Sequence, residues 1–181
     1  MTTTTPTATT AMANIVDLTV DSSDRIYRIE VQGEPQCQPR ARSSWRSKEK
    51  YYYPVSKELK AFKEVVRSAI RETVHGYLFP NGVCVSMTVI CYMKRPNSDF
   101  RNSQRGLGRL KGLLSLAKPQ VPDIDNVAKF ALDGLNKLVY EDDRQVVKLT
   151  IYKLADNEGE CLGRTTLLLS AFNPQTDLPA E

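Results

Sequence analysis

The fold is decided by residues 122–154, PDIDNVAKFALDGLNKLVYEDDRQVVKLTIYKL. Residues 126–137 repeat at helical spacing: the apolar stripe is Val127, Ala131, Leu135 and Leu138, and the polar stripe is Asn126, Lys129, Asp133 and Asn136. Residues 146–154 have the apolar and β-branched content of a strand. An acidic turn, residues 140–145, joins the two elements. The stretch therefore predicts helix, turn and strand, with carboxylates at both ends of the helix.

The flanking sequence extends this pattern in both directions. Residues 25–31 and 83–93 alternate apolar and polar side chains as strands do, and residues 165–172 predict a closing strand. Ser56 is a plausible N-cap for a helix that carries Leu59, Phe62, Val66 and Ile70 at helical spacing. The order predicts an α+β domain with helices packed on a small mixed β-sheet. We expect a disordered N-terminal tail at 1–24, the domain at 25–172 and a C-terminal tail at 173–181.

Composition narrows the class of protein. A chain of 181 residues with 41% hydrophobic content is most simply one domain with a real core. Its apolar runs are too short to span a bilayer, and its start lacks the features of a secretory signal, so no membrane association is expected. The four cysteines form no C-x-x-C pair, which favours reduced thiols in an intracellular protein.

Positive charge is concentrated in two stretches, residues 36–63 and 94–118. Such density predicts a polyanionic partner, because each neutralised phosphate releases condensed counterions. The long loop 94–122 is also typical of a functional segment. The alternative is a solvated surface. The predicted DNA contacts are Arg40, Arg42, Lys94, Arg95, Arg101, Arg105, Arg109, Lys111 and Arg144.

Carboxylates form the candidate site. Asp123 and Asp125 alternate in an extended stretch just before the helix, and Asp143 lies beyond it. A helix of about twelve residues is roughly 18 Å long, so its ends meet only if the chain folds back or a second subunit contributes. Clustered carboxylates favour Mg²⁺ or Mn²⁺, and such a metal can activate water at a phosphodiester. Lys129, one turn into the helix, could neutralise a phosphate oxygen.

Other interpretations of these residues stay open. Asp125 could be a helix N-cap, and Asp142 with Asp143 could be turn residues. A D-x-D pair is also used by Mn²⁺-dependent nucleotide-sugar transferases, although these give no reason for two basic stretches. A catalytically silent DNA-binding module would keep the acidic residues for structure. The single histidine, His75, counts against histidine-based acid–base chemistry.

The acidic motif resembles a known family. The residues Pro122-Asp123-Ile124-Asp125-Asn126, Lys129, Asp133, Leu135-Asn136 and Asp142-Asp143-x-Gln145-Val146 are similar to those of the RusA family of Holliday junction resolvases. Residues 33–42 resemble that family's first basic turn. The resemblance implies a RusA-like homodimer that cleaves branched DNA with Mg²⁺, for which Mn²⁺ substitutes, in paired symmetric cuts. It implies catalytic roles for Asp123, Asp125, Asp143 and Lys129. Lys137 departs from the family, because many relatives have glycine there.

The N-terminal tail carries a second motif. Residues 15–24, IVDLTVDSSD, resemble a SUMO-interacting motif, in which a short β-branched strand precedes acidic and serine residues. The strand would add to a sheet edge of SUMO through Ile15, Val16, Leu18 and Val20. This resemblance implies a nuclear protein, and without it the protein is expected in the cytoplasm. The alternative is an ordinary extra strand or a linker.

Overall fold

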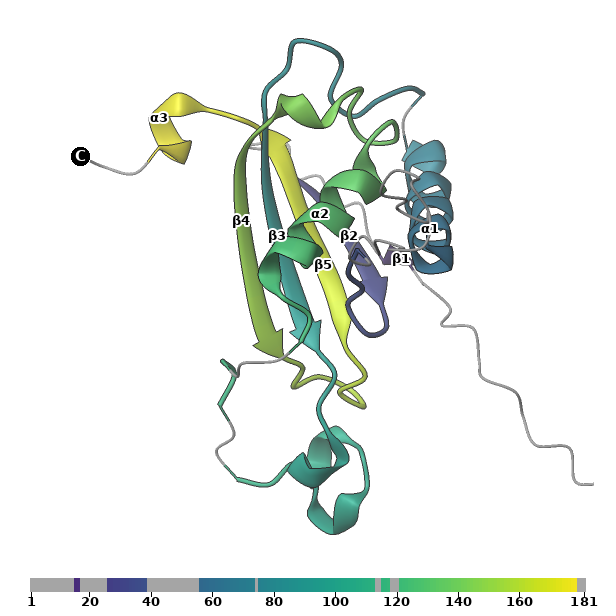
Figure 1. The fold of residues 1–181 in the computed structure, drawn as a ribbon, viewed down its shortest axis with the longest axis vertical. Coiled ribbons are helices and arrows are strands. Elements are labelled where there is room, and N and C mark those ends of the chain that lie inside the picture. Colours follow the sequence, from purple (N-terminus) through teal and green to yellow (C-terminus); the bar gives the residue numbers. More distant parts are fainter. Residues whose placement is uncertain are drawn as a thin grey trace, which may run out of the picture.

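A mixed sheet organises the protein. The computed structural model describes residues 15–16, 26–38, 56–73, 75–112, 115–117 and 121–178. Five strands pair in the order β1-β2-β5-β3-β4, with β3 and β4 parallel and the other pairs antiparallel (Figure 1). Their bounds are β1 Ile15–Val16, β2 Tyr27–Gln32, β3 Val85–Met93, β4 Val146–Ala155 and β5 Arg164–Ala171. The predicted α+β class with a mixed sheet is confirmed.

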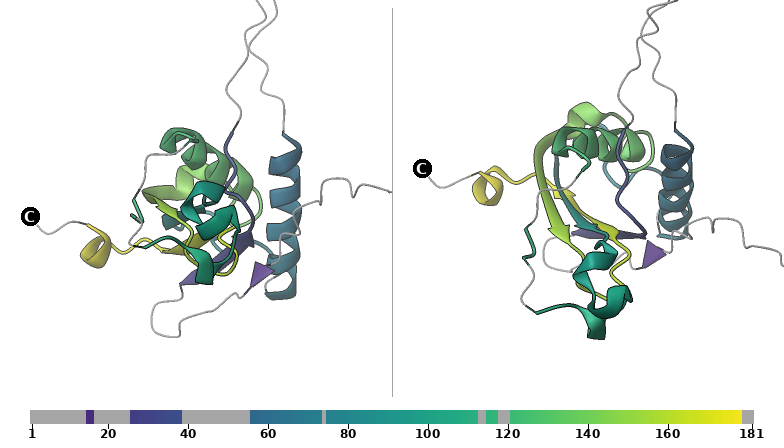
Figure 2. Two further views of the ribbon diagram at one scale, coloured as in Figure 1. Left: turned by 90° about the horizontal axis from the view of Figure 1, so that it is seen from below. Right: turned by 60° about the horizontal axis from the view of Figure 1, so that its bottom comes forward.

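Two long helices cover one face of this sheet (Figure 2). They are α1, Lys57–Thr73, and α2, Ile124–Leu135. Ser56 caps α1 as predicted, because its Oγ accepts a hydrogen bond from the backbone N–H of Leu59 at 3.0 Å. The buried core combines one stripe from each helix with alternate residues of the central strands: Leu59, Phe62, Val66, Ile70, Val127, Phe130, Ala131, Leu135, Met87, Val89, Leu167 and Leu169. Among the described residues, no helix combines the length and apolar character needed to cross a membrane.

The direction of α2 follows from the pairing of β3 with β4. Parallel neighbours require a crossover connection, and α2 supplies it, so α2 runs antiparallel to both strands. Its start therefore lies near the end of β4, where Lys153 Nζ donates a hydrogen bond to the Pro122 carbonyl at 2.5 Å. Its end lies near the start of β4. The two acidic ends of α2 are consequently held at opposite ends of the strand.

Element boundaries differ from the predictions in informative ways. Helix α2 begins at Ile124, two residues before the predicted start, and ends at Leu135 because Lys137 adopts a left-handed conformation with φ of 64°. Lys137 therefore makes this turn in a conformation that glycine adopts most readily. Residues 15–16, expected in a disordered tail, pair with β2 as an extra strand. The predicted C-terminal tail contains a helical turn, α3 Pro174–Asp177, which Asp177 ties to Lys148 at 2.7 Å.

The basic loop is partly ordered. Between β3 and α2 the chain forms three short 3₁₀ turns, η1 Asn97–Asp99, η2 Arg101–Ser103 and η3 Leu107–Arg109. We call residues 94–112 the arm. It projects from the end of the sheet where β3 and β4 finish, away from α1 and α2 (Figure 1). The sequence predicted a long loop here, without the turns.

Candidate functional site

The first acidic pair lies at the start of α2. Asp123 occupies the N-cap position with extended geometry (φ −66°, ψ 149°), and its side chain makes no capping hydrogen bond. Asp125 lies in the first turn, so its interpretation as the N-cap is wrong. Asp123, Asp125 and Lys129 are all exposed. Because the N-terminus of a helix favours negative charge, this turn can hold two carboxylates at the surface.

The segment after β2 packs beside this turn. The backbone N–H of Gln38 donates to the carbonyl of Asn126 at 3.1 Å, and the Gln38 side chain is only 7% exposed. Burial, and secondarily the negative charge of Asp123, raises the pKa of the Cys37 thiol. The described segment after β2 and the first turn of α2 are therefore neighbours.

The second acidic group is held by a capped turn. Asp142 accepts a hydrogen bond from the backbone N–H of Arg144 at 3.0 Å and so caps the 3₁₀ turn η4, Asp143–Gln145. The Gln145 Oε1 accepts from the N–H of Glu141 at 3.0 Å, and its Nε2 donates to the carbonyls of Pro80 at 2.9 Å and Val83 at 3.0 Å. Gln145 thus clamps the turn that carries Asp143. The sequence motif includes Gln145, but this structural role of Gln145 was not predicted from it.

Asp142 and Asp143 have different environments. The Arg144 guanidinium donates to Asp142 through Nε at 2.8 Å, and this bond, followed by that of the Arg144 backbone, lowers the pKa of Asp142 to about 2. The turn interpretation is therefore right for Asp142. Arg144 is 87% exposed but already shares its charge with this carboxylate. Asp143 is half-buried and lies outside that ion pair, so it remains the candidate ligand at this end.

A buried tyrosine connects Asp143 to the end of α2. Tyr140 is fully buried, and its hydroxyl donates to the carbonyl of Leu132 at 3.1 Å. Burial raises the pKa of Tyr140, and the charges of Asp143 and then Asp133 raise it further. Asp133 and Asp143 therefore act on the same buried hydroxyl at the C-terminal end of α2.

The two acidic ends do not meet within one chain. The described residues contain no group of three or more His, Cys, Asp or Glu side chains placed to hold a metal ion. Lys153 holds the start of α2 near the end of β4, whereas Asp143 immediately precedes β4. The seven residue-to-residue steps from Val146 to Lys153 span roughly 23 Å in a strand. The chain therefore does not fold back to join Asp143 with Asp123 and Asp125.

The predicted DNA contacts separate into exposed and buried residues. Lys94, Arg101, Arg109 and Lys111 are exposed on the arm. Arg95 is 1% exposed, and its guanidinium donates hydrogen bonds to groups within the protein. The prediction that Arg95 contacts DNA is therefore wrong. Arg105 is half-buried and donates to the Arg95 carbonyl at 2.6 Å. Arg40 and Arg42 lie outside the described residues, as do Leu18 and Val20.

Comparison with known proteins identifies the family. The family model described as Endodeoxyribonuclease RusA matches residues 32–161, which include the start of α2, Asp143 and the whole arm. The chain is also 35% identical over 135 residues to "Uncharacterized protein YqaN" of Bacillus subtilis (strain 168), covering 72% of this chain and 89% of that protein. The acidic motif and the α+β fold agree with the match. The chain therefore belongs to the RusA family of endodeoxyribonucleases, the Holliday junction resolvases.

Proposed function

We propose that this protein is a Mg²⁺-dependent endonuclease that resolves four-way DNA junctions by paired, symmetric phosphodiester hydrolysis. The observation that carries the proposal is the exposed turn of Asp123, Asp125 and Lys129 at the start of α2, inside the segment that matches the family. This turn presents two carboxylates and one cation to solvent. DNA phosphates can reach such a turn directly.

The chemistry of the donors fits a hard divalent cation. Asp123, Asp125 and Asp143 offer carboxylate oxygens, the ligand type that Mg²⁺ and Mn²⁺ prefer. Bound there, the metal would activate a water molecule and stabilise charge on the phosphodiester. Lys129, one turn from Asp125, would neutralise a non-bridging phosphate oxygen. Mn²⁺ would substitute because it takes the same oxygen ligands.

A second copy of the chain would complete the site. One chain separates Asp143 from the Asp123–Asp125 pair, so three carboxylates can surround one metal only if a partner supplies the third. A two-fold axis beside α2 would set the start of one α2 near the end of the other. The flank where this would occur exposes apolar side chains, Ile124 at 50%, Val147 at 51% and Leu149 at 37%. Strand β4 is also the free edge of the sheet.

The decisive experiment uses synthetic four-way junctions and matched linear duplexes, with and without Mg²⁺. We expect paired, symmetric incisions that need the metal and leave ligatable 5′-phosphate and 3′-hydroxyl ends. Junction binding without incision at any metal concentration would favour the silent DNA-binding module. Binding of a nucleotide sugar with Mn²⁺, and no effect on DNA, would favour the transferase.

We also propose that the N-terminal segment binds SUMO weakly as an added strand, which would make the protein nuclear. The support is that residues 15–16 already add to a sheet edge, pairing with Val31 and Glu30 of β2. Strand β1 is the outermost strand of the described sheet, so its outer edge would offer backbone groups to SUMO while its inner edge pairs with β2. An NMR titration with SUMO should shift resonances of residues 15–20, and Ile15→Ala with Leu18→Ala should abolish the shifts. No shift in the unmodified protein would make the motif a coincidence.

A further inference from the structure

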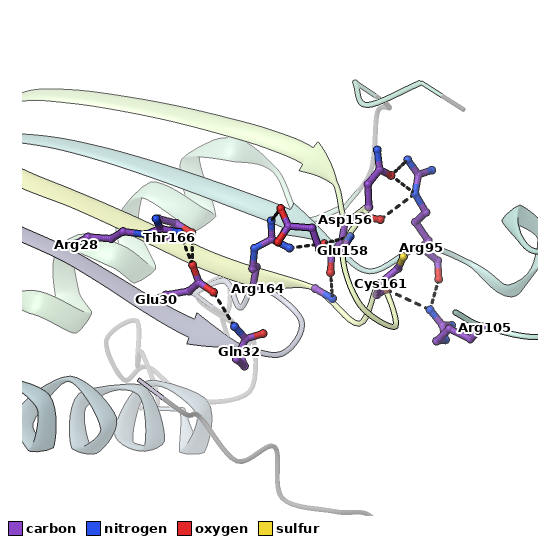
Figure 3. Close-up of polar contacts among 12 residues, drawn as sticks. Arg28, Glu30, Gln32, Arg95, Arg105, Asp156, Glu158, Cys161, Arg164 and Thr166 are labelled. Carbon is purple, nitrogen blue, oxygen red and sulfur yellow. Dashed lines mark hydrogen bonds and ion pairs between the residues drawn. The ribbon is translucent and has the colours of Figure 1, made fainter. Parts of the chain in front are cut away.

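The arm is anchored by one buried arginine. The Arg95 guanidinium donates through Nε to the Asp156 carbonyl at 2.9 Å (Figure 3). It also donates through Nε to Asn157 Oδ1 at 2.8 Å and through NH1 to Asp99 Oδ2 at 3.1 Å. Its NH2 also reaches the Ser115 carbonyl at 3.4 Å. Arg95 therefore joins the start of the arm, its η1 turn, its return segment and the turn between β4 and β5.

The turn that receives Arg95 is itself rigid. The Asp156 carboxylate accepts hydrogen bonds from Arg164 at 2.6 Å and from the backbone N–H of Gly163 at 2.9 Å. Arg164 lies over the Tyr92 ring, 3.8 Å from its centroid, and contacts Glu158 at 2.7 Å. Arg164, Asp156 and Arg95 follow one another from β5 to the base of the arm (Figure 3). The anchor of the arm is thus continuous with the sheet.

The arm has a small core of its own. Phe100 is fully buried and pairs with Leu110 in a backbone bridge. The Arg105 guanidinium lies 5.4 Å from the centroid of the Phe100 ring and donates to Asn97 Oδ1 at 2.7 Å. The backbone N–H of Lys111 donates to the Asp99 carbonyl at 2.9 Å, which closes the segment on itself. A segment with this many internal bonds is ordered before any ligand arrives.

The exposed charge of the arm has a single sign. Its only acidic residue is Asp99, which is 7% exposed and paired with Arg95. Its exposed charged side chains are therefore all cations: Lys94, Arg101, Arg109 and Lys111. The arm also projects beyond the end of the sheet (Figure 1). A narrow cationic projection can reach phosphates of DNA arms that diverge from a branch, whereas a continuous duplex offers it one side only.

We infer that the arm is a preformed element for recognising the branch of a DNA junction, and that Arg95 is the positioning residue that holds its cations in place. This inference rests on the proposed function. Because the arm is ordered beforehand, junction phosphates bind without a further cost of immobilising its side chains. Arg95 acts through Arg101, Arg109 and Lys111 and does not touch the DNA itself.

The test variant is Arg95→Gln with Asp99→Asn, which removes the buried ion pair without leaving a lone buried charge. We expect its dissociation constant for a four-way junction to rise about 10-fold, with a much smaller rise for linear duplex, because the loosened arm must be ordered on binding. Trypsin should cut at Arg101 or Arg109 faster than in the unmodified protein. The matched control, Arg28→Gln with Glu30→Gln, removes an exposed ion pair on the sheet and should change junction affinity less than about twofold.

Combining the two sets of substitutions shows whether Arg95 acts by positioning the cations of the arm or by stabilising the protein in general. The same two changes are made in a protein that already carries Arg101→Ala, Arg109→Ala and Lys111→Ala. There they should raise the dissociation constant for the junction less than about twofold further, because the cations that Arg95 positions are gone. If circular dichroism shows that the test variant does not fold, Asn157→Ala replaces it, since this change removes only hydrogen bonds to Arg95.

The following results decide the inference. Unchanged junction affinity together with unchanged trypsin resistance in the folded variant would overturn it. An equal loss of affinity for junction and duplex would also overturn it, as would a loss of affinity that persists in the triple-alanine background. A junction-specific loss with faster cleavage of the arm would support it. If the unmodified protein shows no preference for junctions, the proposed function fails and the inference fails with it. If the preference is present but insensitive to Arg95 and Asn157, only the role of the arm is wrong.

Discussion

Asp123 and Asp125 stand where extended chain turns into α2, and this local geometry explains why both carboxylates reach solvent. Asp143 differs, because its position depends on Asp142 and Gln145, which fix the turn after α2. The electrostatics of the site therefore divide into a helix-start pair and a turn residue, which lie at opposite ends of α2.

Replacing any one of these carboxylates tests the site. Asp123→Asn, Asp125→Asn or Asp143→Asn keeps side-chain volume but removes charge that would hold the metal, so we expect junction cleavage to fall at least ~100-fold. DNA binding should be kept or strengthened, because less negative charge faces the phosphates. Cleavage and gel-shift assays on the same junction measure both effects. Full cleavage by all three variants would contradict the assignment.

The ion pair of Asp142 with Arg144 leads to a prediction about how the Asp142 carboxyl titrates. Hydrogen bonds from Arg144 lower the pKa of Asp142 to about 2, from an ordinary value of 3.8. A lowered pKa means that the pair stabilises the fold above the ordinary value and that this contribution is lost as pH falls through about 2. Titration of the Asp142 carboxyl by ¹³C NMR should show the low midpoint. In Arg144→Gln the midpoint should move back towards 3.8, and an unchanged midpoint would mean that Arg144 is not the cause.

At the scale of elements, α1 and α2 meet through a glycine. A Cβ added at Gly134 would lie 2.6 Å from Cε1 of Phe62, whose ring packs edge-on against Phe130 with centroids 5.3 Å apart. Phe62 also lines a cavity, so a Cβ at position 134 would make its ring shift into that space and change its contact with Phe130. The absence of a side chain at position 134 therefore sets how closely the two helices approach.

Gly134→Ala should destabilise the protein despite its better helix propensity. The substitution gains about 1 kcal/mol from propensity, but overpacking a core costs typically 1–3 kcal/mol. We expect a net loss of up to about 2 kcal/mol in the free energy of unfolding, measured with denaturant. Gly112→Ala is the control, because an added Cβ there meets nothing within 4 Å. Equal stability of the two variants would mean that the helices can separate freely.

Periodicity predicted the elements whose packing is regular, and it failed where packing is not. Alternation located β2 and β3, and the apolar stripes located α1 and α2. Nothing periodic marks the 3₁₀ turns of the arm, because a few hydrogen bonds around Phe100 hold them. Arg95 was taken for a surface cation because its partners, Asp156 and Asn157, come from a turn some 60 residues later. Burial of a charge depends on such distant partners, which spacing within the sequence does not show.

At the scale of the whole molecule, the sheet topology separates the carboxylates of the proposed site. The parallel pairing of β3 and β4 makes α2 a crossover, so the start and end of this helix cannot meet. The sequence motif predicted the residues and their spacing. The length of the helix predicted that its two acidic ends meet only if the chain folds back or a second subunit contributes. Only the fold shows that the chain does not turn back. The family motif is therefore local in sequence, whereas the site that we propose would be completed by a second chain.

Mixing two inactive variants tests whether sites are shared between subunits. Suppose Asp125→Asn and Asp143→Asn subunits exchange freely, so that about half of the dimers are mixed. If each site takes Asp125 from one chain and Asp143 from the other, a mixed dimer has one site with both substitutions and one intact site. It should nick a supercoiled cruciform plasmid and stall at the nicked circle, although each variant alone is inactive.

The matched control is a mixture of Asp123→Asn and Asp125→Asn subunits. Both substitutions lie at the same end of α2, so every site in a mixed dimer loses one carboxylate and no nicking is expected. Nicking by the first mixture and not by the second would establish that the sites are shared. No nicking by the first mixture, with exchange verified by mass spectrometry, would mean that each chain forms its own site. The turn carrying Asp143 would then have to move towards the start of α2 when DNA and metal bind, which would break the Gln145 contacts with Pro80 and Val83.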